Sequence, residues 1–351
     1  MVPYFLILIL AVFLVYVGQQ TGRTVSTFAW GTTFVLMALF AGLRSLEVGT
    51  DSESFARIFL ASDTFSYVLE HRHTGFVLVS WLTRQFTREY LFVFVFFAAI
   101  TYACYLRAIK RDSIYPTLSL FVFIVGGNYT YPFNLVSQGA AMAVVLLGME
   151  AIYNESFKRF FVYVMIASVF HRSAIFLLPF YFVVIQKNVT THVLILTSGT
   201  VFALFFDRFL AVTLPVIAFE DYLHYVDWRT DAVGLVSTLF LAALALFYLV
   251  FRVRVKAYRP EYDKLLNMFL LGLVIAAATA YHGLAAGGTR RLSLYLTMSS
   301  VYLWPIVYKN LTNSERIIFI ATFVPLYLLY YYMTTNAFGD VMPYRINPII
   351  W

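Results

Sequence analysis

The feature that most constrains this chain is a series of long apolar runs separated by short polar or charged stretches. Only 12% of the residues are charged and 61% are apolar, whereas a soluble domain carries about 25% charged residues. Only helices and closed barrels satisfy every backbone group in lipid, and these runs are continuous, without the alternation of barrel strands. The runs lie near residues 2–18, 27–43, 91–106, 114–127, 138–154, 159–170, 174–186, 190–206, 232–251, 265–281, 292–308 and 315–333. We therefore predict an all-α, polytopic membrane protein with about twelve transmembrane segments (10–13), forming a single integral membrane domain over residues 1–351.

The basic residues predict which loops face the cytoplasm, because inner loops are enriched in Lys and Arg. When the strongly basic loop at 252–264 is placed inside, all the lysines fall inside and both ends of the chain fall outside. The lysines are Lys110, Lys158, Lys187, Lys256, Lys264 and Lys309. The same topology predicts two large outer loops, at 44–90 and 207–231. It also makes 75–86 a helix in the outer interface, because a span there would turn the basic loop outward.

The outer segments contain many arginines and no lysine. They are Arg44, Arg57, Arg72, Arg84, Arg88, Arg172, Arg208, Arg229, Arg290, Arg291 and Arg345. A guanidinium binds phosphate through two parallel hydrogen bonds, so the set points to an anionic ligand such as a lipid pyrophosphate. The alternative is that individual arginines pair with outer acids, among them Glu47, Glu53, Asp63, Glu89, Asp207 and Asp231. The net charge of +7 does not indicate nucleic-acid binding, because the basic residues are scattered among apolar segments.

Two outer motifs carry groups that can move a proton. Asp51 follows a Gly49-Thr50 turn in the first large loop, where it is either a base or merely the cap of a short helix. His171 lies beside Arg172 between two short apolar runs. Ionisable groups at membrane depth are costly and suggest function, although a hydrogen bond that caps the hairpin would also explain a histidine there. No metal site is expected, because His71 and His73 alone are a weak ligand pair.

The order of several motifs resembles the EpsG-like, Wzy-type polysaccharide polymerases. These motifs are Arg44 with Gly49-Thr50-Asp51, the pair Gly75-Phe76, the stretch Asn134-Leu-Val-Ser137-Gln138, and Phe170-His171-Arg172-Ser173-Ala174. The resemblance covers most of residues 40–185, and later only Arg290-Arg291 to Tyr295 and the hydropathy are similar. Two positions depart from the family pattern, which usually has Arg at Ser137 and Tyr at Phe55.

The resemblance implies a polymerase of oligosaccharide repeat units carried on undecaprenyl pyrophosphate, in O-antigen, capsule or exopolysaccharide synthesis. Its site would face the periplasm from a bacterial inner membrane, among membrane lipids, with no cofactor and with a separate protein controlling chain length. The residues that it assigns to pyrophosphate are Arg44, Arg172, Arg290 and Arg291. Those that it assigns to the glycan or acceptor are Glu53, His73, Gln138 and Tyr295.

Either His171 or Asp51 is the base in this scheme. A guanidinium disfavours a second positive charge nearby, so Arg172 keeps His171 neutral and able to accept a proton. We therefore assign proton removal to His171, with Asp51 orienting the acceptor hydroxyl or the imidazole.

Two other functions remain open from the sequence. A lipid-linked glycan transporter or flippase would also use outer arginines, but we find no internal repeat and no matching pair of broken spans. A membrane O-acyltransferase would also use a His–Arg site, but it needs an acyl donor from the cytoplasm, and the predicted topology places His171 outside.

Overall fold

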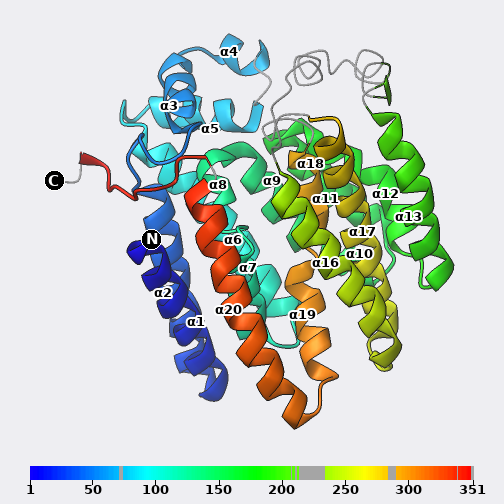
Figure 1. The fold of residues 1–351 in the computed structure, drawn as a ribbon. Coiled ribbons are helices and arrows are strands. Elements are labelled where there is room, and N and C mark those ends of the chain that lie inside the picture. Colours follow the sequence, from blue (N-terminus) through cyan, green and yellow to red (C-terminus); the bar gives the residue numbers. More distant parts are fainter. Residues whose placement is uncertain are drawn as a thin grey trace. The chain divides into compact units, whose positions relative to one another are not determined.

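The described part of the chain is built from helices (Figure 1). The structure is a computed structural model that describes residues 1–70, 74–206, 208–209, 212, 234–283, 290–337 and 339–348. Within these ranges the one β-type pairing is an isolated antiparallel bridge between Arg44 and Ile346. The all-α prediction is confirmed.

The chain divides into two compact units. Unit 1 comprises residues 1–151, 156–176 and 311–351, and unit 2 comprises 152–155 and 177–310. The helices of unit 1 are α1 (Val2–Gln20), α2 (Arg23–Gly42), α3 (Ser52–Ala61), α4 (Phe65–Glu70), α5 (Thr74–Arg84), α6 (Leu91–Asp112), α7 (Pro116–Val125), α8 (Tyr131–Asn134), α9 (Val136–Leu147), α11 (Phe157–Phe170), η1 (Arg172–Phe176) and α20 (Asn313–Ala337). Those of unit 2 are α12 (Leu177–Val184), α13 (Val189–Leu204), α16 (Leu235–Phe251), η3 (Arg252–Arg254), α17 (Arg259–Tyr281), α18 (Arg291–Thr297) and α19 (Ser300–Lys309), while α10 (Met149–Tyr153) joins the two units. The single domain expected over 1–351 stays a prediction.

Each of the predicted apolar runs forms a helix or a pair of consecutive helices. By length and composition, seven described helical segments are able to cross a membrane. They are Val2–Gln20, Arg23–Gly42, Leu91–Asp112, Val136–Tyr153, Leu235–Arg254, Arg259–Tyr281 and Asn313–Ala337. The other runs form shorter elements: α7, α11, η1 with α12, α13, and α18 with α19. A polytopic membrane protein is confirmed, with several helices shorter than the sequence predicted.

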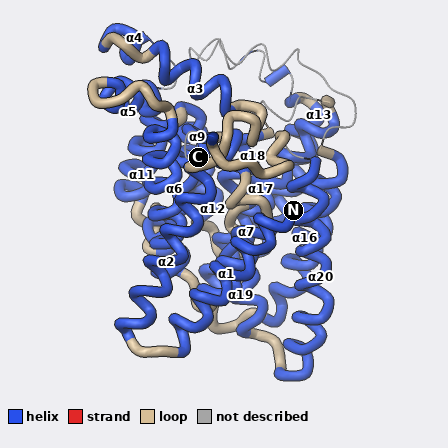
Figure 2. Tube along the Cα trace, turned by 90° about the vertical axis from the view of Figure 1, so that its left-hand side faces the viewer, coloured by secondary structure: helices blue, strands red, loops and turns tan. Residues whose placement is uncertain are grey.

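Most of the segment 75–86 lies in α5, which has 11 residues and ends at Arg84. At about 1.5 Å per residue α5 is roughly 17 Å long, well short of a hydrocarbon core of about 30 Å. Its length therefore fits an interfacial helix and not a span. Both views place α3, α4 and α5 beyond one end of the long helices of unit 1 (Figures 1 and 2).

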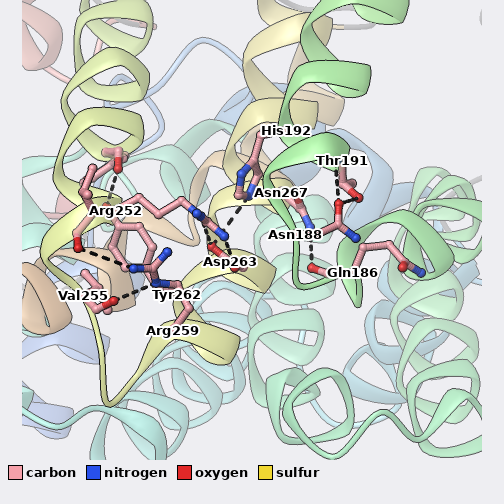
Figure 3. Close-up of polar contacts among 12 residues, drawn as sticks. Gln186, Asn188, Thr191, His192, Arg252, Val255, Arg259, Tyr262, Asp263 and Asn267 are labelled. Carbon is pink, nitrogen blue, oxygen red and sulfur yellow. Dashed lines mark hydrogen bonds and ion pairs between the residues drawn. The ribbon is translucent and has the colours of Figure 1, made fainter.

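Unit 2 is organised around α17, which packs against α12, α13, α16, α18 and α19. Three fully or almost fully buried polar side chains near its start, Asp263, Lys264 and Asn267, each hold a different neighbour. Asp263 accepts two hydrogen bonds from Arg252, at 2.6 and 2.7 Å (Figure 3). Lys264 donates to the carbonyls of Ile152 and Tyr153 and to Glu155, and Asn267 donates to the carbonyls of Val183, Val184 and Gln186. A buried charge or amide costs free energy unless it is hydrogen-bonded or paired, so these contacts fix how the helices of unit 2 assemble.

Candidate active site

An aromatic cluster ties together the segments of unit 1 that carry the predicted site residues. Its buried members come from α3, α5, α6 and α9: Phe55, Phe59, Phe76, Val93, Phe94, Phe97, Val136 and Ala140, with Phe170 of α11 packed against them. Successive rings touch, with centroids 4.8 Å apart for Phe55 and Phe76, 5.1 Å for Phe76 and Phe97, and 6.1 Å for Phe97 and Phe170. Each aromatic ring buries a large apolar area, so the cluster fixes these helix ends relative to one another.

The cluster packs together the segments that carry three of the predicted site residues. Asp51 begins α3 one turn before the buried Phe55, Gln138 lies in α9 between Val136 and Ala140, and His171 directly follows Phe170. Gly75 allows this arrangement, because a Cβ there would lie 2.7 Å from the carbonyl oxygen of Val169. The Gly-Phe pair that opens α5 therefore serves packing.

Asp51 occupies the N-cap position of α3, but its carboxylate makes no capping hydrogen bond. Its backbone carbonyl accepts from Phe55 N at 3.0 Å, and the single O–H of Thr50 is shared between the Asp51 carboxylate at 3.4 Å and Asn134 Oδ1 at 3.3 Å. Asp51 therefore stands at the position of a helix cap, but its side chain does not cap the helix.

His171 ends α11 and begins the short helix η1. Its backbone N–H donates to Ala167 O at 2.9 Å, and its carbonyl accepts from Ala174 N at 3.0 Å, so the main chain makes this turn. The side chain is half-buried, while the next residue, Arg172, is exposed. A ligand therefore reaches the side chain of Arg172 more readily than that of His171.

Arg44 is enclosed by aromatic rings and is only 2% exposed. Its guanidinium donates to Ala41 O at 2.5 Å and to Phe133 O at 2.8 Å, and it lies 4.8 Å from the ring centroid of Phe94 and 5.2 Å from that of Phe133. Burial lowers the pKa of Arg44 to about 10, which still leaves it protonated at neutral pH. No described carboxylate pairs with it, so neutral carbonyls hold this side chain and its positive charge is not compensated.

Arg290 in unit 2 is held in the same way. It donates to the hydroxyls of Thr238 and Ser237 at 3.0 and 2.7 Å, and to the carbonyls of Gly234 and Ala276. Arg291, which begins α18, is half-buried, and Tyr295 of the same helix is fully buried. These three residues belong to unit 2, whereas Arg44, Asp51, Gln138, His171 and Arg172 belong to unit 1.

Several of the arginines predicted to lie outside pair with acidic residues, as the alternative interpretation of these arginines expected. Arg57 pairs with Glu53 at 3.4 Å, and both side chains are more than two-thirds exposed. Arg84 pairs with Asp63, and Arg345 pairs with Glu47. Glu53 therefore already has a partner on the surface. His73, which was predicted to bind the glycan, lies outside the described residues, and its role stays a prediction.

The sequence did not single out two contributors to this end of unit 1. Asn134 of α8 is 1% exposed and contacts the turn that carries Asp51, and residues 339–347 run along 43–50. Asn134 begins the motif Asn134-Leu-Val-Ser137-Gln138, which was the one sequence signal that could have pointed to it. Nothing local in 339–347 predicts a partner almost 300 residues earlier in the chain.

A model of the EpsG family matches residues 27–346, nearly the whole chain and both units. The chain belongs to the EpsG family. No curated protein and no solved structure matches it significantly. The family resemblance predicted from the motifs is confirmed, and the match includes all the proposed site residues.

Membership of the EpsG family supports a polysaccharide-polymerase type of role, that is, a glycosyltransferase-like membrane enzyme of polysaccharide biosynthesis. The seven apolar helices agree with an enzyme that is embedded in a membrane. The roles of individual residues in this EpsG family member stay predictions.

Proposed function

We propose that this EpsG family member joins oligosaccharide repeat units carried on undecaprenyl pyrophosphate. The donor is a growing glycan on the lipid, and the acceptor is a single repeat unit on a second copy of the same lipid. The reaction takes place on the periplasmic face of a bacterial inner membrane, and a separate protein sets the chain length.

One observation carries the proposal. Asp51, Gln138 and His171 lie in segments that one aromatic cluster holds together, and the same cluster includes Phe94, whose ring centroid lies 4.8 Å from the guanidinium of Arg44. Glycosyl transfer from a pyrophosphate needs a group that takes a proton and positive charge near the leaving group. Both requirements are met by residues of unit 1.

The chemistry balances with these groups alone. The acceptor hydroxyl oxygen forms a bond to the anomeric carbon of the donor while the bond from that carbon to the phosphate oxygen breaks. His171 takes the hydroxyl proton, and the pair of electrons from the broken bond leaves with the lipid pyrophosphate. Asp51 orients the acceptor hydroxyl or the imidazole, so the reacting atoms are held in position before the bond forms.

The arginines have different tasks according to their burial. Arg172 is exposed and makes no ion pair with a described residue, so its fork is available to the pyrophosphate. Arg44 already binds carbonyls, and we assign it to the electrostatic field at the leaving group. The roles proposed for Arg290 and Arg291 at the pyrophosphate, and for Gln138 and Tyr295 at the sugar, rest on the family resemblance, because Arg290 already donates to two hydroxyls and two carbonyls and because Gln138 and Tyr295 are buried.

The test is to incubate the purified protein with the purified lipid-linked repeat unit, without metal or nucleotide, and to separate the glycans by length on a gel. A ladder of longer glycans supports the proposal. Unchanged length with transfer of the substrate across a proteoliposome membrane would identify a transporter. Unchanged length with a new ester on the sugar would identify an acyltransferase.

A further inference from the structure

Residues 339–347 run antiparallel to the segment that carries Arg44 and Asp51. The two segments are joined near both of their ends, so the pairing rests on more than a single contact. Four backbone hydrogen bonds join them: Ser45 N to Arg345 O at 2.9 Å, Asn347 N to Leu43 O at 2.8 Å, Gly49 N to Asp340 O at 3.0 Å, and Thr50 N to Gly339 O at 3.1 Å.

Side chains anchor the 339–347 segment to the helices beneath it. The ring of Tyr344 stacks on Phe40 with centroids 3.9 Å apart, and its hydroxyl donates to Phe40 O at 2.7 Å. Asn347 Nδ2 donates to the hydroxyl of Tyr90 at 2.7 Å. The segment is therefore held on α2 and at the start of α6, which are the elements that also hold Arg44.

Asn134 lies at the end of the pairing where Thr50 meets Gly339. Its Nδ2 donates to Gly339 O at 2.9 Å, and its Oδ1 accepts from Thr50 Oγ1 at 3.3 Å and from Asp51 N at 3.4 Å. The partners fix the orientation of the amide, because a carbonyl needs a donor and a backbone N–H needs an acceptor. Asn134 therefore binds the site turn with one half of its amide and the 339–347 segment with the other.

Two glycines make room for this amide. Gly49 has φ +98° and Gly339 has φ +57°, conformations that favour glycine. A Cβ at Gly49 would lie 2.7 Å from Asn134 Oδ1, and a Cβ at Gly339 would overlap Asn134 Nδ2. Both turns are thus shaped to receive the side chain of Asn134.

From this geometry we propose that Asn134 is a positioning residue, which holds Asp51 in place by fastening its turn to the 339–347 segment. The inference rests on the proposed function, in which Asp51 orients the acceptor or the imidazole. It adds that the 339–347 segment, far from Asp51 in sequence, belongs to the catalytic apparatus. Only a neutral amide fulfils the role, since a carboxylate lacks the donor for Gly339 O and an aliphatic side chain lacks both groups.

The activity test compares two buried asparagines. Asn134→Ala should lower kcat roughly 10²-fold, with a smaller change in donor KM, because misplacing a reacting group costs rate more than binding. Asn267→Ala is the matched control, because Asn267 is also fully buried and donates to carbonyls, but it lies in unit 2. The control should lower thermal stability while kcat of the folded fraction stays within about twofold of the wild type. Equal losses of kcat in the two variants would overturn the positioning role.

The pH profile gives a second readout that lost stability alone would not move. Asn134→Asp keeps the acceptor oxygens and places a negative charge beside Asp51. A nearby negative charge favours protonation of a carboxylate, so the loss of rate that comes from protonating Asp51 should begin at a higher pH than in the wild type. An unshifted profile in this variant would contradict the proposal.

Hydrogen exchange separates this inference from the proposed function, because it needs no substrate. The amides of Gly49 and Thr50 bond to the 339–347 segment, so Asn134→Ala should speed their exchange, and Asn267→Ala should not. If exchange is unchanged although kcat falls, Asn134 does not act by fastening the segments.

If exchange of these amides becomes faster and kcat is unchanged, the 339–347 segment has no catalytic role. If the wild type makes no polymer, the proposed function is wrong, and the exchange result still decides whether Asn134 joins the two segments.

Discussion

Replacing Arg44 with lysine is expected to destabilise the protein before any effect on chemistry is considered. The guanidinium holds two carbonyls at 2.5 and 2.8 Å and lies 4.8 and 5.2 Å from the ring centroids of Phe94 and Phe133. A lysine ammonium keeps at most one carbonyl in this geometry and weakens the contact with the two rings. A hydrogen bond from a charged donor contributes about 1.5–3 kcal/mol, and a desolvated cation–π contact contributes up to about 2 kcal/mol. Arg44→Lys should therefore lower the free energy of unfolding by roughly 2–5 kcal/mol.

The assay is denaturant unfolding of the detergent-solubilised protein, with Arg172→Lys as the control. Arg172 is exposed and has no described ion-pair partner, so this variant should unfold within about 0.5 kcal/mol of the wild type. Its polymerisation rate should nevertheless fall on the order of 10²-fold, because an ammonium does not reproduce the two-pronged contact with pyrophosphate. Wild-type stability in Arg44→Lys would refute the energetic reasoning, and normal polymerisation in both variants would refute the pyrophosphate roles.

Three further predictions concern the base, the core of unit 2 and the topology. His171→Gln should abolish the acidic limb of the activity–pH profile and most of the activity, whereas Asp51→Asn should lower the rate and keep the limb; the reverse pattern would make Asp51 the base. Asp263→Asn should cost about 3–5 kcal/mol of unfolding free energy, because it removes one partner of a buried ion pair, while Glu53→Gln in an exposed pair should cost less than about 1 kcal/mol; equal effects in denaturant titrations would contradict this assignment. An amine reagent confined to the periplasm should leave Lys256 unlabelled in intact spheroplasts, as mass spectrometry of the peptides would show, and strong labelling would reverse the orientation.

The helices were predictable because hydropathy is a local property of the chain. Each apolar run became helical, and the segment 75–86 lies mostly in α5, whose length of 11 residues fits the interfacial prediction. The breaks within runs were not predicted. The run at 138–154 is divided between α9 and α10 at Gly148, where a Cβ would lie 2.9 Å from Tyr163, so a contact with α11 marks the break.

The candidate site was predictable in its residues and less so in their contacts. Spacing identified Asp51 and His171, and the aromatic cluster explains why their segments lie together. The sequence did not reveal that backbone carbonyls hold Arg44, because a carbonyl partner has no sequence signature. The role of Asn134 depends on Gly339, 205 residues away, and on backbone turns at both ends of that contact.

The central claim is that a glycosidic bond forms as the lipid pyrophosphate leaves, and counting the two products together tests it most directly. Purified protein would be supplied with a lipid-linked repeat unit that carries separate radiolabels in the glycan and in the lipid. We predict one molecule of undecaprenyl pyrophosphate released for each new linkage, with both products lost in parallel in His171→Gln. Longer glycans without release of the lipid pyrophosphate, or release without new linkages, would contradict the account.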